Sequence, residues 1–380
     1  MKKNYFMLAL ASMMMAACAN NDLVDDLVKE EVPQAIGFET FAQKATRAEN
    51  SSAAYSWALD AHHNTFKVWG GKQLKNGTLL PVYGIGIGSE GTVTHDGTNW
   101  HASPIKYWDR AAEKYVFFAA APANAGWVAD VNTANDFSTG YVTLSNFELK
   151  GTNLSVKNTT SSPVHNWKGD EDVDLLISEN TEVARSHYSG GSAENVQLNF
   201  SHILSRLNII VCKHSDITAD VVVTELVVDK LKNKGSFNEN LATAVATSPG
   251  SIARWKDHDG SYNITGLTGN VSTNKDAYLI QSLVIPQAIT YEAVDVNGAG
   301  TMNQAYFKIA YTVGGEPFYG YYNLAAAFGA DEDPATAPGT SFNFGEGWQN
   351  TLTIVINPAG ITFTGSVAEW AVVDKEGEID

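Results

Sequence analysis

The chain is a succession of short runs of β-forming residues with almost no 3.6-residue periodicity between them. The runs are bounded by Gly, Asn, Asp, Ser or Pro, which favour turns. The predicted strands are 35–41, 82–87, 115–119, 141–144, 173–177, 196–200, 207–212, 221–228, 277–285, 305–312, 318–322, 351–356 and 361–363. A helical turn is predicted at 324–328. Many short strands without intervening helices predict an all-β fold made of sandwiches or barrels.

One segment predicts an interruption between two strands. Large apolar residues occupy every second position over 196–200 and again over 207–211, but the parity differs between the two runs. A strand cannot change its buried face without an interruption, so we predict a kink or short helical turn at 201–206. The Gly- and Ser-rich stretch 189–192 just before it predicts a boundary between two domains near residue 190.

The N-terminus has the layout of a bacterial lipoprotein signal. Two lysines precede an apolar stretch, 5–17, which ends in small residues directly before Cys18. We therefore predict a signal peptide over 1–17, acylation of Cys18, and an acidic tether over 18–34. An ordinary secretory signal is the alternative. No later apolar run approaches the roughly 20 residues of a membrane helix, so lipid is the predicted anchor.

Net charge and cysteine content restrict the function further. The formal charge is −17 at pH 7, which repels nucleic acid, so no nucleic-acid partner is predicted. The hydrophobic content of 44% is enough for buried cores. If Cys18 is lipidated, Cys212 is the one remaining cysteine and no intramolecular disulfide can form. Cys212 lies in a β-type run, so we expect a buried side chain rather than a reactive thiol.

No motif for catalysis, a metal or a cofactor is recognisable, so the chain is predicted not to be an enzyme. The histidines are scattered, and the acidic segment 170–174 lacks the spacing of a calcium loop. Trp100, Trp108, Trp127 and Trp167 could stack on sugars, but packing in the core is the favoured interpretation. A surface hydrolase is kept as a remote alternative, because carboxylate pairs can be recognised only from distances.

Several short sequence motifs, taken in order, resemble those of a known family. They are Ile36-Gly37-Phe38, Lys44 to Ala48, Tyr107-Trp108, Tyr115 to Pro122, Asp174 to Leu176, Leu198 to Leu207, Leu283 to Gln287, Trp348 and Thr351 to Ile354. Together they resemble the fimbrillin-like proteins of Bacteroidales, the subunits of type V pili. The resemblance implies two tandem transthyretin-like β-sandwich domains, which we place at 35–190 and 191–380.

The resemblance also implies a mechanism of assembly. The lipidated precursor reaches the outer surface of the outer membrane, where an Arg-directed protease cuts the exposed loop 42–52 after Arg47. The first strand is then lost, and a strand from another subunit takes its place by β-strand addition. Ile36, Phe38 and Phe41 are the side chains that we expect to fill the space between the sheets.

The implied partners are other pilus subunits and, through the lipid, the outer membrane, and a host or glycan ligand is left open. The roles of stalk, tip or anchor also stay open, because the acidic C-terminal segment 370–380 has few side chains that could fill a partner's groove. The alternative is a cell-surface glycan-binding lipoprotein that never polymerises. Arg-specific cleavage followed by oligomer formation would separate the two.

Overall fold

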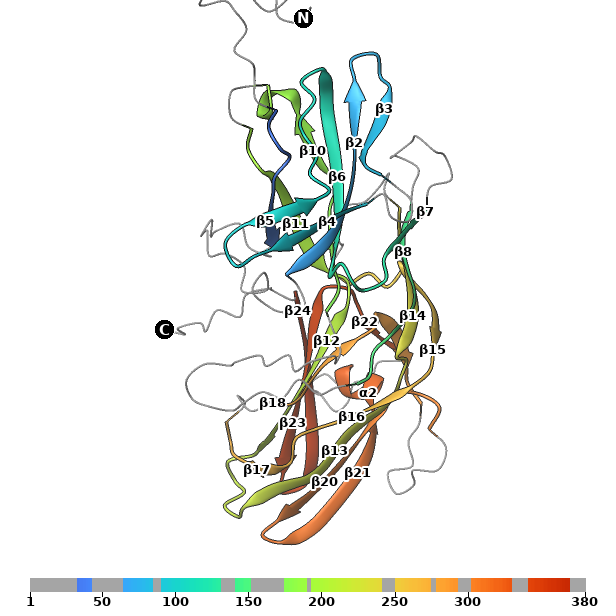
Figure 1. Ribbon diagram of the computed structural model, residues 1–380. Coiled ribbons are helices and arrows are strands. Elements are labelled where there is room, and N and C mark those ends of the chain that lie inside the picture. The colour runs from blue at the N-terminus through green and yellow to red at the C-terminus, as the bar shows by residue number, and fades with distance from the viewer. Residues whose placement is uncertain are drawn as a thin grey trace, which may run out of the picture.

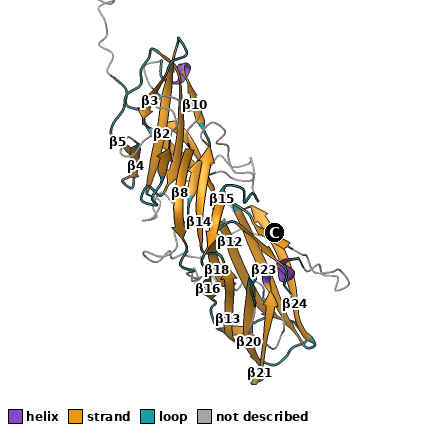
Figure 2. Ribbon diagram, turned by 90° about the vertical axis from the view of Figure 1, so that its right-hand side faces the viewer, coloured by secondary structure: helices purple, strands orange, loops and turns teal. Residues whose placement is uncertain are grey.

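The computed structural model confirms an all-β fold, drawn out along one axis (Figures 1 and 2). The structure describes residues 33–42, 64–84, 90–130, 141–151, 174–189, 193–240, 250–274, 278–292, 302–329 and 341–369. Within them, the predicted helical turn is present as the five-residue helix α2 (Leu324–Phe328).

The upper part of the molecule in Figure 1 holds a nine-stranded sheet in the order β1-β11-β9-β6-β2-β4-β5. Its strands are β1 (Phe38–Ala42), β2 (Thr65–Leu74), β4 (Gly91–His95), β5 (Trp100–Ser103), β6 (Ala112–Ala121), β9 (Leu176–Ser178) and β11 (Val196–His202), with β3 (Leu79–Tyr83) on β2 and β10 (Thr181–Ala184) on β6. A short 3-10 helix, η3 (Arg185–His187), follows β10.

Four further sheets complete the fold. One has the order β15-β14-β8-β7, from β7 (Val128–Asp130), β8 (Tyr141–Glu148), β14 (Lys234–Asn240) and β15 (Trp255–Asp259). The next, β18-β12-β23-β24, contains β12 (Ser205–Lys213), β18 (Tyr278–Val284), β23 (Trp348–Asn357) and β24 (Gly360–Glu369). The third, β16-β13-β20-β21, contains β13 (Val221–Leu231), β16 (Tyr262–Thr265), β20 (Tyr306–Val313) and β21 (Glu316–Asn323), with β17 (Gly269–Val271) on β13. The last pairs β19 (Gln287–Thr290) with β22 (Ser341–Phe344).

The predicted break lies at Ile203 and Leu204, between β11 and β12. β11 belongs to the nine-stranded sheet and β12 to the sheet with β23, so the chain changes sheets there. The carbonyls of the two residues are fixed by hydrogen bonds from Trp255 Nε1 at 2.8 Å and from the Gly347 amide at 2.9 Å. The change of parity in the sequence therefore corresponds to a change of partner sheet.

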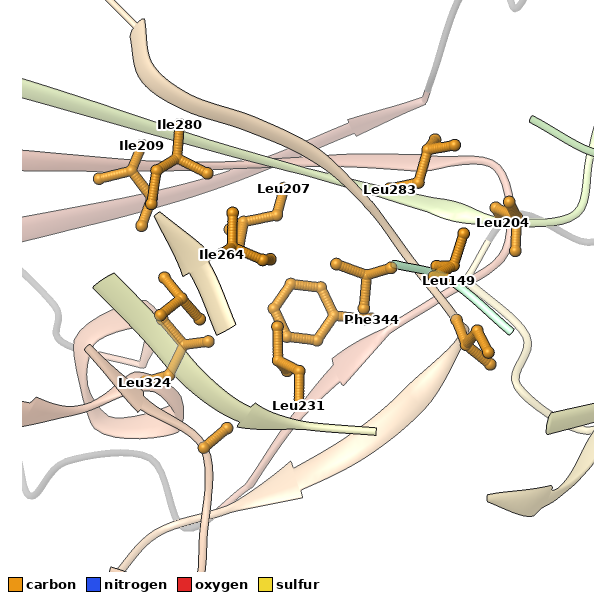
Figure 3. Packing of buried hydrophobic residues seen from close by; sticks show 14 of the residues in the cluster. Leu149, Leu204, Leu207, Ile209, Leu231, Ile264, Ile280, Leu283, Leu324 and Phe344 are labelled. Atoms are coloured by element: carbon orange, nitrogen blue, oxygen red, sulfur yellow. The ribbon is translucent and has the colours of Figure 1, made fainter. Parts of the chain in front are cut away.

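Two hydrophobic cores follow from this arrangement. The smaller core lies against the nine-stranded sheet and takes Val196, Leu198 and Phe200 from β11. The larger core takes Leu207 and Ile209 from β12 and runs on through the other sheets, as the packing in Figure 3 shows. Cys212 is buried, as predicted.

Strand pairing crosses residue 190 in both directions. β8, which precedes it, pairs with β14, and β11, which follows it, completes the nine-stranded sheet. The boundary at residue 190 and the transthyretin-like arrangement of the two halves stay predictions.

A buried ion cluster ties three segments of the lower half together. The Arg254 guanidinium, just before β15, donates hydrogen bonds to Glu239 of β14 and to Glu346 in the turn between β22 and β23. Glu346 has no solvent exposure. Burial raises the pKa of Glu346 to about 7 and also raises the pKa of Glu239, because one guanidinium only partly offsets the desolvation of two carboxylates.

Candidate functional site

The candidate site is the first strand together with the two segments that hold it. β1 is an edge strand, and in the described part of the chain its one sheet partner is β11. The two strands run parallel, with Phe38 beside Val196 and Ala42 beside Phe200. A parallel neighbour requires a long connection rather than a hairpin, which is why β1 and β11 lie far apart in the sequence.

The residues just before β1 pair with a different segment. The Ile36 amide donates to the carbonyl of Lys106 at 2.8 Å, and the Trp108 amide donates to the carbonyl of Gln34 at 3.0 Å. An antiparallel bridge joins Ala35 and Tyr107. The first segment is thus hydrogen-bonded to 106–108 at its start and to β11 afterwards. We call these two segments the acceptor edge.

The partner changes at Gly37, whose carbonyl accepts a hydrogen bond from the Val196 amide at 2.8 Å. A Cβ at position 37 would lie 2.1 Å from Asn195 Oδ1. A side chain there would therefore displace Asn195 at the point where the segment passes from one partner to the other.

The inward side chains of the segment alternate as in a half-buried strand. Ile36 is 3%, Phe38 2% and Thr40 7% exposed. Ile36 and Phe38 belong to the smaller core, as their prediction as inward-facing side chains expects. The side chain of Phe41 lies outside the described residues. Thr40 was missed from the sequence, although the two-residue period that starts at Ile36 points to it.

Phe38 makes three aromatic contacts in this core. Its ring centroid lies 5.5 Å from Phe117, 5.9 Å from Tyr83 and 6.2 Å from Phe66, which belong to β6, β3 and β2. The contacts with Phe66 and Phe117 are edge-to-face, a favourable arrangement for aromatic rings. One side chain of the first strand therefore touches three other strands of the sheet.

Around these contacts lies a layer of buried aromatic residues. Trp108 stacks on Tyr188 at 4.8 Å, and the Tyr188 hydroxyl donates to the Ala112 carbonyl at 2.8 Å. Burial raises the pKa of Tyr83 to about 12. The layer is therefore uncharged at neutral pH and suited to receive apolar side chains.

The solvent side of the pair is polar. Glu39 is exposed and accepts hydrogen bonds from Asn195 Nδ2 at 3.1 Å and from Gln197 Nε2 at 2.8 Å. Gln197 is also the register partner of Glu39. Because these groups are exposed to water, their hydrogen bonds fix the register of β1 against β11 more than they stabilise the fold.

A second edge strand lies in the lower half. β24 ends its sheet and pairs with β23, from Trp348 beside Glu369 to Asn357 beside Gly360. Ile361 and Phe363 are partly buried against the larger core, whereas Thr362 and Thr364 are exposed. The Ile-x-Phe spacing of β24 repeats that of Ile36 and Phe38.

The other predicted residues are distributed as follows. Cys18, Arg47 and Trp167 lie outside the described residues. Trp108 and Trp127 are buried, which confirms their assignment to the core. The ring centroid of Trp100 lies 4.9 Å from that of Phe66.

The described residues hold no group of three or more His, Cys, Asp or Glu that could bind a metal ion. Nor, among the same residues, is any helix long and apolar enough to cross a membrane.

The buried pair His202 and Asp174 joins β11 to the start of the segment that enters β9.

The comparisons with known proteins cover most of the chain. A family model described as fimbrillin-like matches residues 46–370. A fimbrial protein from Bacteroides vulgatus ATCC 8482 has a similar structure, with a TM-score of 0.52 and 17% identity over 89% of this chain and 99% of its own. A candidate cell adhesion protein from Bacteroides uniformis ATCC 8492 gives a TM-score of 0.44 and 14% identity, with the same coverage of both chains. A search of the curated proteins found no match.

Proposed function

Because the chain belongs to the fimbrillin-like family, we propose that it is an adhesive subunit of a cell-surface fimbrium. We further propose that it is exported as a lipoprotein through Cys18, and that subunits join when a neighbour's strand replaces β1 on the acceptor edge.

The observation that carries this proposal is the way in which β1 is held. β1 has a single sheet partner among the described residues, yet Phe38 of β1 and Ile36 just before it are buried almost completely. Full burial of each of these side chains contributes about 1.5–3 kcal/mol. Departure of β1 would expose this apolar surface and the unpaired backbone groups of β11, which favours its replacement by another strand.

A replacement must supply apolar side chains at alternate positions. β24 offers Ile361 and Phe363 at the spacing of Ile36 and Phe38, and most of its side chains are exposed. We propose β24 as the donor strand. Its donation would break the contacts of Phe363 with Phe307 and Tyr322, at 5.6 and 5.0 Å, so the acceptor edge must offer at least as much burial.

Cleavage after Arg47 would make the exchange possible by ending the covalent link between β1 and the rest of the chain. An attached strand competes at high effective concentration with any strand from outside. A detached fragment is lost by dilution once it dissociates. The uncut chain should therefore stay monomeric, whereas the cut chain should accept a partner strand.

The test is to treat the purified chain with an Arg-specific protease and follow its oligomers by size-exclusion chromatography with light scattering. Wild type should lose its N-terminal segment and form oligomers. Arg47→Ala should stay a folded monomer, and Lys44→Ala, in the same loop, should behave as wild type.

Two results would contradict the proposal. One is an Arg47→Ala protein that forms oligomers as readily as wild type. The other is a wild-type chain that is cut after Arg47, loses residues 33–42 and remains monomeric, which would favour the glycan-binding lipoprotein that does not polymerise.

A further inference from the structure

The hairpin of β20 and β21 lies at the opposite end of the molecule from the nine-stranded sheet (Figures 1 and 2). β20 pairs with β13 on its other side, so one face of β13, β20 and β21 covers the larger core. Ile309 and Tyr311 of β20 point into that core. Because side chains alternate along a strand, Lys308 and Ala310 lie on the outer face.

The outer face carries three tyrosines, Tyr306, Tyr319 and Tyr321, which we call the tyrosine face. Tyr319 is 62% exposed and lies opposite Ala310, the smallest side chain of its row. Tyr321 lies opposite Lys308, and its ring centroid is 6.1 Å from that of Tyr306. The three rings therefore line one surface of two adjacent strands. Ala310 lies between Tyr319 and β13, and its small side chain leaves the space between them open.

Polar groups adjoin the rings on the side of β13. The Lys308 ammonium donates to Glu225 Oε2 at 2.5 Å and lies 5.9 Å from the centroid of the Tyr321 ring. The Tyr306 hydroxyl donates to Asp229 Oδ2 at 2.9 Å. An ammonium has three N–H donors and a carboxylate has about four acceptor positions, so these groups can make further hydrogen bonds.

The protonation states of Tyr306 and Lys308 do not change near neutral pH. Burial and the hydrogen bond to Asp229 raise the pKa of Tyr306 to about 12. The hydrogen bond to Glu225 raises the pKa of Lys308. The phenol and the ammonium therefore remain donors.

The edge of β21 is less suited to a partner than its face. Val313 and Glu316 close a two-residue turn, so the next pair, Thr312 and Pro317, is the one whose backbone groups point away from each other. Pro317 has no N–H there, which removes a donor from the free edge and disfavours addition of another strand.

From this arrangement we infer that the tyrosine face binds neutral hexopyranose units of a glycan. The C–H groups of one side of a pyranose ring can lie on the electron-rich face of a phenol ring, and its hydroxyls can bond to Lys308, Glu225 and Asp229. Two carboxylates accompany one ammonium at this surface, on a chain of net charge −17, which disfavours acidic sugars. The inference rests on the proposed adhesive function and names what the subunit adheres to.

The experiment applies the uncut full chain to a glycan array that carries neutral glucose, galactose and mannose oligosaccharides beside sialylated and sulfated ones. The affinity for each retained neutral glycan is then measured by calorimetry. Tyr319→Ala should weaken binding about ten-fold, and Tyr319→Trp should restore it, because a ring is again available for stacking. Tyr141→Ala, which removes a 39%-exposed tyrosine from β8, should bind as wild type.

Four results would overturn the inference. They are no binding of any neutral glycan, binding of acidic glycans alone, undiminished binding by Tyr319→Ala, and a wild-type dimer that Tyr319→Ala dissociates in sedimentation. The Arg47→Ala chain separates this inference from strand exchange, because it should bind the glycan normally even though it does not assemble. An Arg47→Ala chain that assembles like wild type and still binds the glycan would therefore count against strand exchange alone.

Discussion

Phe38 shows how a single side chain can connect an edge strand to the rest of the fold. Its ring meets Phe66, Tyr83 and Phe117, which come from three different strands. On the outer face of β1, Glu39 instead bonds to exposed amide groups. The two faces of the same strand should therefore respond differently to truncation.

We predict that Phe38→Ala lowers the free energy of unfolding of the uncut chain by about 3–5 kcal/mol, because it removes buried surface and leaves a cavity. Glu39→Ala should change it by less than about 0.5 kcal/mol. Urea unfolding followed by tryptophan fluorescence measures both. Equal effects of the two substitutions would mean that β1 does not contribute its buried face to stability.

Glu346 leads to a prediction about pH. Its pKa is about 7 in the folded chain and near 4.5 when unfolded, so the folded chain binds the proton more tightly. The resulting stability is fully present below pH 4.5 and is lost as pH rises through 7. Glu239, whose pKa is also raised, acts in the same direction.

The free energy of unfolding of the wild type should thus fall by about 3 kcal/mol between pH 4.5 and 8 from Glu346 alone. Glu346→Gln should reduce this slope, and the exposed-site variant Glu316→Gln should leave it unchanged. Urea unfolding at a series of pH values measures the slope. A Glu346→Gln profile identical to that of the wild type would show that this carboxyl does not take up the proton.

Strands β1 and β24 are both edges of their sheets. The Ile-x-Phe spacing of Ile361 and Phe363 in β24 matches that of Phe38 at the start of β1 and Ile36 just before it. β1 is buried on its inner face, whereas β24 is mostly exposed and has only partial burial of Ile361 and Phe363. This difference is what a strand exchange requires, since the donor must gain burial when it moves to an acceptor edge.

If β24 is the donor, Phe363→Ala should reduce oligomer formation by the cut chain at least ten-fold, while the uncut variant stays folded. Thr364→Ala changes the opposite face of the strand and serves as the matched control. Light scattering after Arg-specific cleavage gives the oligomer fraction. Should the two variants assemble equally well, the donor is another segment.

Much of this element-level structure could be predicted from the sequence. The pattern over 35–41 predicts a strand with Ile36 and Phe38 inward. The parity change predicts a break within 201–206, and the structure has it at Ile203 and Leu204. The partner of β1 could not be predicted, because parallel pairing with β11 depends on contacts distant in sequence.

The candidate binding surface shows the same limit of local patterns. From the sequence, tryptophans are the aromatic residues considered for stacking on sugars, and two of them, Trp108 and Trp127, are buried. The tyrosine face is formed by the register of β20 and β21, which places Tyr319 and Tyr321 beside Ala310 and Lys308. No pattern within one strand indicates that register.

At the scale of the whole molecule, the proposed sites lie at two separate places. The acceptor edge consists of β11 in the nine-stranded sheet and the neighbouring segment 106–108, and the tyrosine face lies on the hairpin at the far end (Figure 1). A third feature, the predicted lipid on Cys18, precedes the first described residue. Attachment, assembly and adhesion can therefore be tested by independent substitutions.

For attachment, we predict that Cys18→Ala abolishes labelling by radioactive palmitate and releases the protein from the membrane fraction. The reason is that Cys18 is the one predicted acylation site. Cys212→Ala is the matched control, and because Cys212 is buried, its replacement should leave labelling unchanged. Undiminished labelling of Cys18→Ala would contradict the lipoprotein prediction.

The parallel direction of β1 and β11 has a consequence for the geometry of a fibre. A strand that takes the place of β1 in the same register must run in the same direction, with its first residues beside Trp108. Each contact would then join two different surfaces, so successive subunits all point the same way. Such a fibre is polar: one terminal subunit keeps an unoccupied acceptor edge and the other an unused donor strand, so growth and capping at its two ends require different chemistry.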